Sequence, residues 1–226
     1  MEDSTSLFGG IFAGIYLSEE VLLRLFSSIM AKTLNWSWKS IFSGYTMIAV
    51  LSTLFMSSVH KYPLTEKEMR KNEQSSPFEK VTVVGKLLIS DRKMKYMIPL
   101  NAVFGFSAAF ITSFVNGEVI RVVLSDQNST DIGFLTALTS CVAAVLSVVL
   151  GFVAQKIGRG PILILGSISF FMVGFLFAIR PSLLDWGVAS LALVYIFQGI
   201  GRATFEGTLR AEFAIMFAEE KEGAVS

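Results

Sequence analysis

Apolar runs that are free of charge dominate this chain and are separated by short charged stretches. Five runs of 16 to 24 residues contain no Asp, Glu, Lys or Arg; they cover residues 40–59, 96–117, 132–155, 160–179 and 186–201. A helix rises about 1.5 Å per residue, so about 20 residues cross roughly 30 Å of hydrocarbon. A sixth apolar run, near residues 7–31, is interrupted by three charged side chains. The pattern predicts an all-α fold, a polytopic transmembrane bundle with six helices, at about 7–31, 40–60, 96–117, 132–155, 160–180 and 186–210.

The composition supports a membrane protein and excludes several functional classes. Hydrophobic residues make up 53% of the chain and charged residues 16%, with a mean hydropathy of +0.61. A soluble domain usually carries about 25% charged residues. The net charge of +1 gives no indication of nucleic-acid binding. One cysteine, one histidine and no nucleophile paired with a base predict no enzyme, no cofactor and no metal site.

Basic residues are concentrated in one polar stretch. Residues 61–95 carry nine of the 19 Lys and Arg residues, and the positive-inside rule places this linker in the cytosol. Counting crossings then puts the basic turn near Lys156 on the same side. Two Asn-x-Ser/Thr sequences, at Asn35 and Asn128, fall in loops on the side opposite the cytosol and are glycosylation candidates. Two such sequences also arise by chance in a chain of this length. The pattern does not distinguish the plasma membrane from an internal membrane.

The turn between the fourth and fifth predicted helices carries a motif. Residues 151–160 read Gly-Phe-Val-Ala-Gln-Lys-Ile-Gly-Arg-Gly. They resemble the signature loop of the major facilitator superfamily, Gly-x-x-x-Asp-Arg/Lys-x-Gly-Arg-Arg/Lys, which joins the second and third helices of each half. The matching residues are Gly151, Lys156, Gly158 and Arg159. Gln155 replaces the acidic residue, which puts the charge relay of the family's gating latch in doubt; an ordinary basic turn is the alternative interpretation.

Two stretches near the end of the chain narrow this resemblance. Residues 198–208 and 219–224 are similar to the uncoordinated-93-like branch of the superfamily, the ion channel regulatory family. Residues 7–28 resemble the fifth helix of that branch. The resemblance therefore implies that the six helices correspond to helices five to ten of a twelve-helix fold.

This correspondence implies a division of the chain. Residues 1–60 would end the N-terminal half, residues 61–95 would link the halves in the cytosol, and residues 96–226 would begin the C-terminal half. The chain would then be part of a longer protein. A natural six-helix protein that dimerises is the alternative.

The narrower resemblance also implies a function. It favours a non-enzymatic regulator or escort of an ion channel or another membrane protein within the lipid bilayer. The alternative is a secondary transporter that moves a small solute by rocking one half against the other, with the solute bound near the midplane.

Three charged residues lie inside the first predicted helix. Glu19 comes about 12 residues, or roughly 18 Å, after its start, close to the middle of the membrane. A charge at that depth costs about 3 kcal/mol unless it is paired or hydrated. Glu20 and Arg24 are four residues apart and can pair on one face. They are predicted to line a cavity, with Glu19 as a protonatable group; a structural ion pair, or a segment lying on the membrane surface, is the alternative.

The last predicted helix carries a polar stripe. Its members recur every four residues and are Gln198, Arg202, Glu206 and Arg210. Arg202 is expected near the inner edge of the hydrocarbon, where a long side chain can reach the surface. A gating or substrate role and a solvated helix end held by ion pairs are both consistent with this spacing. Asn101 and Asn116, in the third helix, are predicted either to join helices or to line the cavity.

Overall fold

The computed structural model describes residues 2–59, 82, 90, 92–125 and 130–216, and these residues form helices and no strand. The helices are α1 (Glu2–Thr33), α2 (Trp38–Ser57), α5 (Arg92–Ala109), α6 (Ile120–Leu124), α7 (Thr130–Ile157), α8 (Gly160–Ile179), α9 (Val188–Ala203) and α10 (Arg210–Met216). A π-helix, η1 (Phe110–Val119), joins α5 to α6, and another, η3 (Thr204–Leu209), joins α9 to α10. A short 3-10 turn, η2 (Leu183–Asp185), precedes α9.

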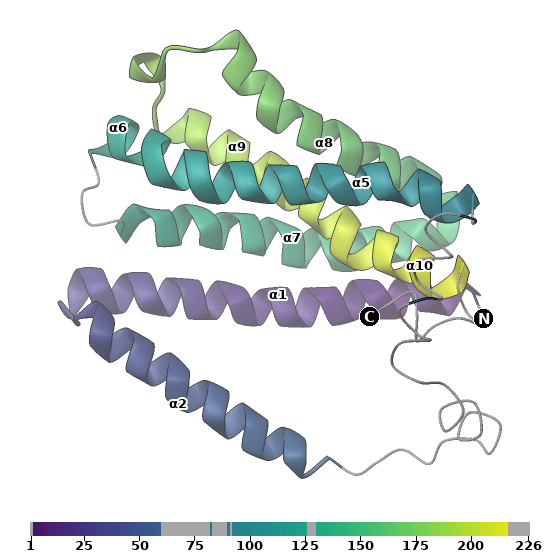
Figure 1. Cartoon of the computed structure of the whole chain (residues 1–226), viewed down its shortest axis with the longest axis horizontal. Helices are drawn as coiled ribbons and strands as arrows, with labels where there is room; N and C mark the ends of the chain where they lie inside the picture. Colours follow the sequence, from purple (N-terminus) through teal and green to yellow (C-terminus); the bar gives the residue numbers. More distant parts are fainter. Residues whose placement is uncertain (1, 60–81, 83–89, 91, 126–129, 217–226) are drawn as a thin grey trace.

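Six helical spans in the described part of the chain are long and apolar enough to cross a membrane, which confirms the predicted fold class. Figure 1 shows successive spans running in opposite directions. The start of α1, the start of α5 and the α7–α8 turn lie at one end, whereas the α1–α2 turn, α6 and η2 lie at the other. This alternation agrees with the crossing count made from the sequence. The cytosolic side of the membrane stays a prediction.

Helix α7 is the centre of the bundle and packs against α1 on one side and α9 on the other. Helices α5 and α8 pack against α9, and α2 slopes away from the bundle (Figure 1). Near its start α2 is joined to α1 by Tyr45, whose hydroxyl donates to the carbonyl oxygen of Leu23 at 2.8 Å and contacts the Ser27 hydroxyl. The bundle therefore brings α1, α5, α7 and α9 around a common interior.

Small residues set the close approach of α1 and α7. A Cβ atom on Gly10 would lie 2.5 Å from the carbonyl oxygen of Ser147 and 3.1 Å from the Cα of Gly151. One turn on, a Cβ atom on Gly14 would lie 3.3 Å from the carbonyl oxygen of Ala144. Lipid offers no hydrophobic drive for helix association, so such backbone contact supplies the attraction. These contacts indicate that Gly10 and Gly14 serve the packing of α1 against α7.

The observed helices are longer than the charge-free runs. The third span reaches Leu124, beyond Glu118 and Arg121, and ends where Ser125 adopts a left-handed backbone with φ 53°. The predicted third helix ends near residue 117, so the observed loop after this span is correspondingly shorter. Charges mark the edge of the hydrocarbon, whereas a helix ends where the backbone leaves helical dihedrals. The linker of residues 61–95 lies largely outside the described residues, and its last four residues belong to α5.

Candidate functional site

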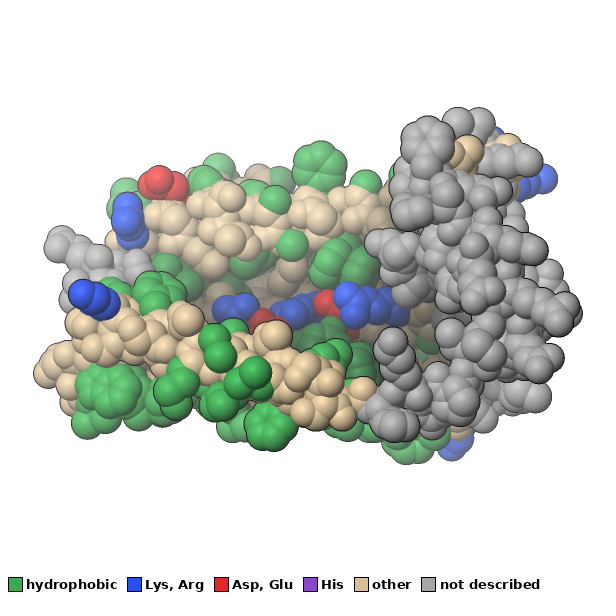
Figure 2. Space-filling model, turned by 60° about the horizontal axis from the view of Figure 1, so that its bottom comes forward, with side chains coloured by type: hydrophobic (Ala, Val, Ile, Leu, Met, Phe, Trp, Pro, Cys, Tyr) green, Lys and Arg blue, Asp and Glu red, His purple; other side chains and the backbone are tan. Residues whose placement is uncertain are grey.

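Five charged side chains from two spans form one connected row, which we call the charge ladder. Its members, in order, are Arg24 and Glu20 of α1, Arg202 of α9, Glu206 of η3 and Arg210 of α10. The Glu20 carboxylate lies 2.6 Å from Arg24 Nη2 and 2.6 Å from Arg202 Nη2. The Glu206 carboxylate lies 3.8 Å from Arg202 Nε and 2.8 Å from Arg210 Nη2. Figure 2 shows basic and acidic side chains in a row along the floor of a hollow.

The ladder joins the first span to the sixth near the midpoints of both spans. Glu20 lies near the midpoint of its span, Thr5–Thr33, and Arg202 near the midpoint of Val188–Phe213. The helix continues beyond Arg202 through η3 and α10, consistent with the predicted range of about 186–210. The depth of Arg202 in the membrane stays a prediction. Arg202 donates two hydrogen bonds to Glu20, at 2.6 and 3.0 Å.

The local sequence explains the ion pairs within each of the two helices. Four-residue spacing places Glu20 and Arg24 on one face of α1, and the same spacing repeats from Arg202 through Glu206 to Arg210. Glu206 is 7% exposed, whereas the side chain of Arg210 is 58% exposed. Both ends of the ladder are therefore more exposed than its middle, because the side chain of Arg24 is 39% exposed. It is neither an isolated pair nor a wholly solvated helix end.

A pocket of about 290 Å³ lies beside two ladder residues, Arg24 and Arg202. Arg24 of α1 and Arg202 of α9 contribute guanidinium groups to its wall. Asn116 of η1 and Gln198 of α9 contribute carboxamides, and Phe104 of α5 contributes an aromatic ring. With Thr136 and Thr139 of α7, residues from four spans enclose one volume inside the bundle.

Hydroxyl groups hold the two carboxamides in place. Tyr195, which is fully buried, donates from its hydroxyl to Asn116 Oδ1. Ser107 donates in the same way to Gln198 Oε1. Thr139 in turn donates to the carbonyl oxygen of Tyr195 at 3.0 Å. The pocket wall is therefore ordered by hydrogen bonds between spans rather than by apolar contact alone.

The structure brings some predicted residues together and separates others. Asn116 and Gln198 line the pocket, but Asn101 donates to the carbonyl oxygen of Met97 in its own helix at 3.1 Å and is not part of the wall. Glu19 is exposed and lies outside the ladder. Sequence reasoning missed Tyr195. Extending the stripe of Gln198 and Arg202 back by three residues, one helical turn, would have found it.

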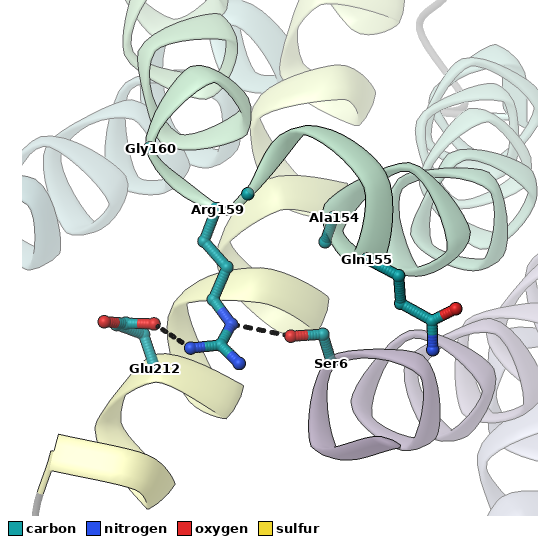
Figure 3. Close-up of a pocket in the computed structure, with 7 residues that line it drawn as sticks. Ser6, Ala154, Gln155, Arg159, Gly160 and Glu212 are labelled. Carbon is teal, nitrogen blue, oxygen red and sulfur yellow. Dashed lines mark hydrogen bonds and ion pairs between the residues drawn. The ribbon is translucent and has the colours of Figure 1, made fainter. Parts of the chain in front are cut away.

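A second cavity, of about 320 Å³, lies at the α7–α8 turn. Arg159 donates from Nη1 to Glu212 of α10 at 2.8 Å and from Nε to the Ser6 hydroxyl of α1 at 2.7 Å. Figure 3 shows its guanidinium between these two side chains and Gln155 directed away from them. Arg159, at the start of α8, thus links α8 to α1 and α10. Glu212 is the carboxylate that binds it.

The two glycines that match the motif, Gly151 and Gly158, have different roles. Gly158 has φ +82°, a left-handed conformation, and its amide donates to the Ala154 carbonyl oxygen at 3.1 Å, which caps α7. Gly151 lies earlier, where a Cβ atom would meet the backbone of Ser6 at 3.2 Å and of Gly10 at 3.4 Å. Only Gly158 is a turn residue; Gly151 permits the crossing with α1. Lys156 is exposed.

The glycosylation candidates differ in what the structure describes. Asn35 is exposed in the α1–α2 turn, with φ 52°. Asn128 lies outside the described residues. Within the described part of the chain, no group of three or more His, Cys, Asp or Glu side chains is placed to hold a metal ion.

Comparison with known families decides what kind of bundle this is. The family model of the Major Facilitator Superfamily matches residues 2–226, which is the whole chain except Met1. The chain belongs to the major facilitator superfamily. No curated protein and no solved structure shows a significant match to it. The family match supports a multi-pass protein in contact with the lipid bilayer, and the branch within the superfamily stays a prediction.

The α7–α8 turn can be compared with the signature pattern of the major facilitator superfamily. The family's pattern has an acidic residue where this chain has Gln155, so the acid that holds the turn must come from elsewhere. Glu212 supplies it from α10, across 53 sequence positions. The side chains of Arg159 and Glu212 are 19% and 18% exposed, so water screens this pair only partly.

Replacing Glu212 by glutamine is expected to weaken this end of the bundle. Arg159 would lose its carboxylate and keep the Ser6 hydroxyl, at a cost of about 1.5–3 kcal/mol for a charged hydrogen bond. The free energy of unfolding, followed by titration with sodium dodecyl sulfate in mixed micelles, measures the change. Lys32→Gln is the matched control, because it removes the more exposed pair with Asp131 and should cost less than about 1 kcal/mol. Equal losses in the two variants would contradict a special role for Glu212.

Proposed function

We propose that this protein is a secondary transporter that binds a small polar solute in the pocket beside the charge ladder and moves it by alternating access. The observation that carries the proposal is the pocket's position. The pocket lies within the spans, from the middle of the third and sixth spans to the second and third turns of α7, and is lined by charged and polar groups from four spans. Polar residues at that depth are costly and mark solute pathways, and transporter sites lie near the midplane between structural repeats.

The predicted division into halves gives the ladder a part in this motion. If residues 61–95 link the halves, α1 belongs to one half, and α5 to α10 belong to the other. The Glu20–Arg202 contact then joins the halves beside the solute pocket. A buried ion pair contributes little net stability compared with apolar packing, and switching between two arrangements is a use that such pairs serve. Solute binding next to Arg202 would compete for the same guanidinium.

The regulator or escort role remains a prediction of the narrower resemblance. One of the two stretches behind it, residues 219–224, lies outside the described residues. In the other, the residues of η3 are largely buried, including Glu206 and Thr208. Buried residues serve the interior of the bundle rather than a docking surface. The geometry therefore favours a carrier over a partner protein.

Access to the pocket from both sides of the membrane tests this proposal without knowledge of the solute. Thr112 lines the pocket, so Thr112→Cys in a Cys141→Ser background places one thiol there. A carrier that alternates is expected to expose this thiol to a membrane-impermeant maleimide from either face. The measurement compares labelling of right-side-out and inside-out vesicles. Phe106→Cys is the control, because Phe106 is 79% exposed on the outside of the bundle and should face lipid.

Labelling of Thr112→Cys from only one face, under every condition tried, would contradict alternating access. If Phe106→Cys is labelled to the same extent as Thr112→Cys, the reagent reaches the lipid-facing surface. Labelling of Thr112→Cys from both faces would then count against the proposal.

A further inference from the structure

We propose that the solute of this pocket is a monocarboxylate with an apolar body. The inference rests on the proposed function in taking the pocket as the solute site. It goes further in naming the chemistry of the solute from the groups that line the wall.

The charges of the wall favour an anion. Arg24 and Arg202 both line the pocket, and no carboxylate is among its lining residues. Glu20 lies behind them with both oxygens engaged: Oε1 accepts from Arg24 and Arg202, and Oε2 accepts from Arg202. Each guanidinium has five N–H donors, of which Glu20 uses only part. A cation entering the pocket would meet two positive groups and no free acceptor charge.

The neutral groups of the wall are also donors. The carboxamide oxygens of Asn116 and Gln198 already accept hydrogen bonds from Tyr195 and Ser107. Each amide is left with its NH₂ group to offer. The hydroxyl of Thr112 donates to the carbonyl oxygen of Ala108 at 2.8 Å. The pocket therefore presents mainly N–H groups, which suits a carboxylate with its several acceptor sites.

The remaining wall is apolar and its size is limited. Phe104 stacks on Phe205 with 3.7 Å between ring centroids and meets Phe170 edge-on at 5.9 Å, so its ring is held in place. Ala108 and Ile111, four and seven residues after Phe104, also line the pocket. A volume of about 290 Å³ is at the lower limit of roughly 300 Å³ for drug-sized ligands. A solute that fits this pocket is an anion with about a dozen non-hydrogen atoms and one apolar end.

The ladder's charge count favours a single negative charge. Its three arginines and two glutamates sum to one net positive charge. A monocarboxylate would neutralise the cluster, whereas a dicarboxylate would leave it negative within the membrane. Uncompensated charge at this depth is costly, so the neutral complex is favoured.

Binding of three matched probes to the purified protein tests this inference. Phenylacetate, phenylacetamide and phenethylammonium share a ring and a similar size, and differ in charge. We expect phenylacetate to bind with a Kd at least about tenfold lower than that of phenylacetamide, because a charge-assisted hydrogen bond replaces a neutral one. Phenethylammonium is expected not to bind. Isothermal calorimetry in detergent gives the constants.

Two variants tie the selectivity to the pocket. Arg24→Gln removes one lining guanidinium while Arg202 keeps Glu20 paired, and it should raise the phenylacetate Kd about tenfold. Lys32→Gln removes a cation from the same helix outside the pocket and should leave the Kd unchanged. Equal binding of phenylacetate and phenylacetamide, preference for phenethylammonium, or no binding of any probe would each overturn the inference. Labelling of Thr112→Cys from both faces would then still support a carrier. Phenylacetate binding with one-sided labelling would support the carboxylate site and contradict the carrier.

Discussion

Replacing Glu20 by glutamine is expected to lower the free energy of unfolding by about 1.5–3 kcal/mol, the worth of a hydrogen bond to a charged group, because the Glu20–Arg202 pair is only partly buried. The substitution removes the carboxylate that lies 2.6 Å from both Arg24 and Arg202. The two guanidiniums would then face each other as like charges at the middle of the membrane. Arg202 would keep the Glu206 carboxylate, at 3.8 Å, and the Ser140 hydroxyl, at 3.5 Å. Titration with sodium dodecyl sulfate in mixed micelles provides the measurement.

The neighbouring residue supplies the control for this experiment. Glu19→Gln makes the same chemical change one position earlier, on an exposed side chain outside the ladder. It is expected to leave the free energy of unfolding within about 0.5 kcal/mol of the parent or to raise it. Similar losses in the two variants would mean that the ladder does not hold α1 to α9.

Replacing Gly10 by valine is expected to separate α1 from α7, with a loss of about 3 kcal/mol in the free energy of unfolding. The added Cβ would lie 2.5 Å from a backbone oxygen of α7, and no side-chain rotation can relieve a contact with backbone. Because Glu20 lies on the same helix, the variant should also weaken phenylacetate binding. The same titration and calorimetry give both values.

Gly44→Val on α2 is the matched control for Gly10→Val. It makes the same change in another membrane span, where an added Cβ would meet nothing within 4 Å. Its expected effect is below about 1 kcal/mol, the difference in helix propensity. A larger loss from Gly44→Val than from Gly10→Val would show that the α1–α7 contact does not determine stability.

The sequence was sufficient to predict the number of helices and insufficient to predict their ends. A charge-free run of about 20 residues predicts a membrane-spanning helix, because the backbone of a lipid-exposed segment must satisfy its own hydrogen bonds. Charged residues such as Glu118 and Arg121 do not stop a helix; they only mark where lipid gives way to water. Ser125 ends the third span through its left-handed backbone, which no charge pattern indicates.

The same limit applies to the site. The Glu20–Arg24 pair follows from spacing within one helix, and so do the pairs of Glu206. The contact of Arg202 with Glu20 joins positions 182 residues apart, and periodicity within one helix does not identify its neighbour. The partner of Arg159 was missed for a related reason. The family's pattern directed attention to position 155, whereas the acid, Glu212, lies on another helix.

The odd number of charges in the ladder has an electrical consequence. One net positive charge that moves through the full field of a membrane gains or loses about 2.3 kcal/mol for each 100 mV of potential. An empty carrier would therefore reorient at a rate that depends on voltage. A carrier loaded with one carboxylate would be electrically silent in that step. Membrane potential would then act on the return of the unloaded form, and uptake would be electrogenic even without a coupling ion.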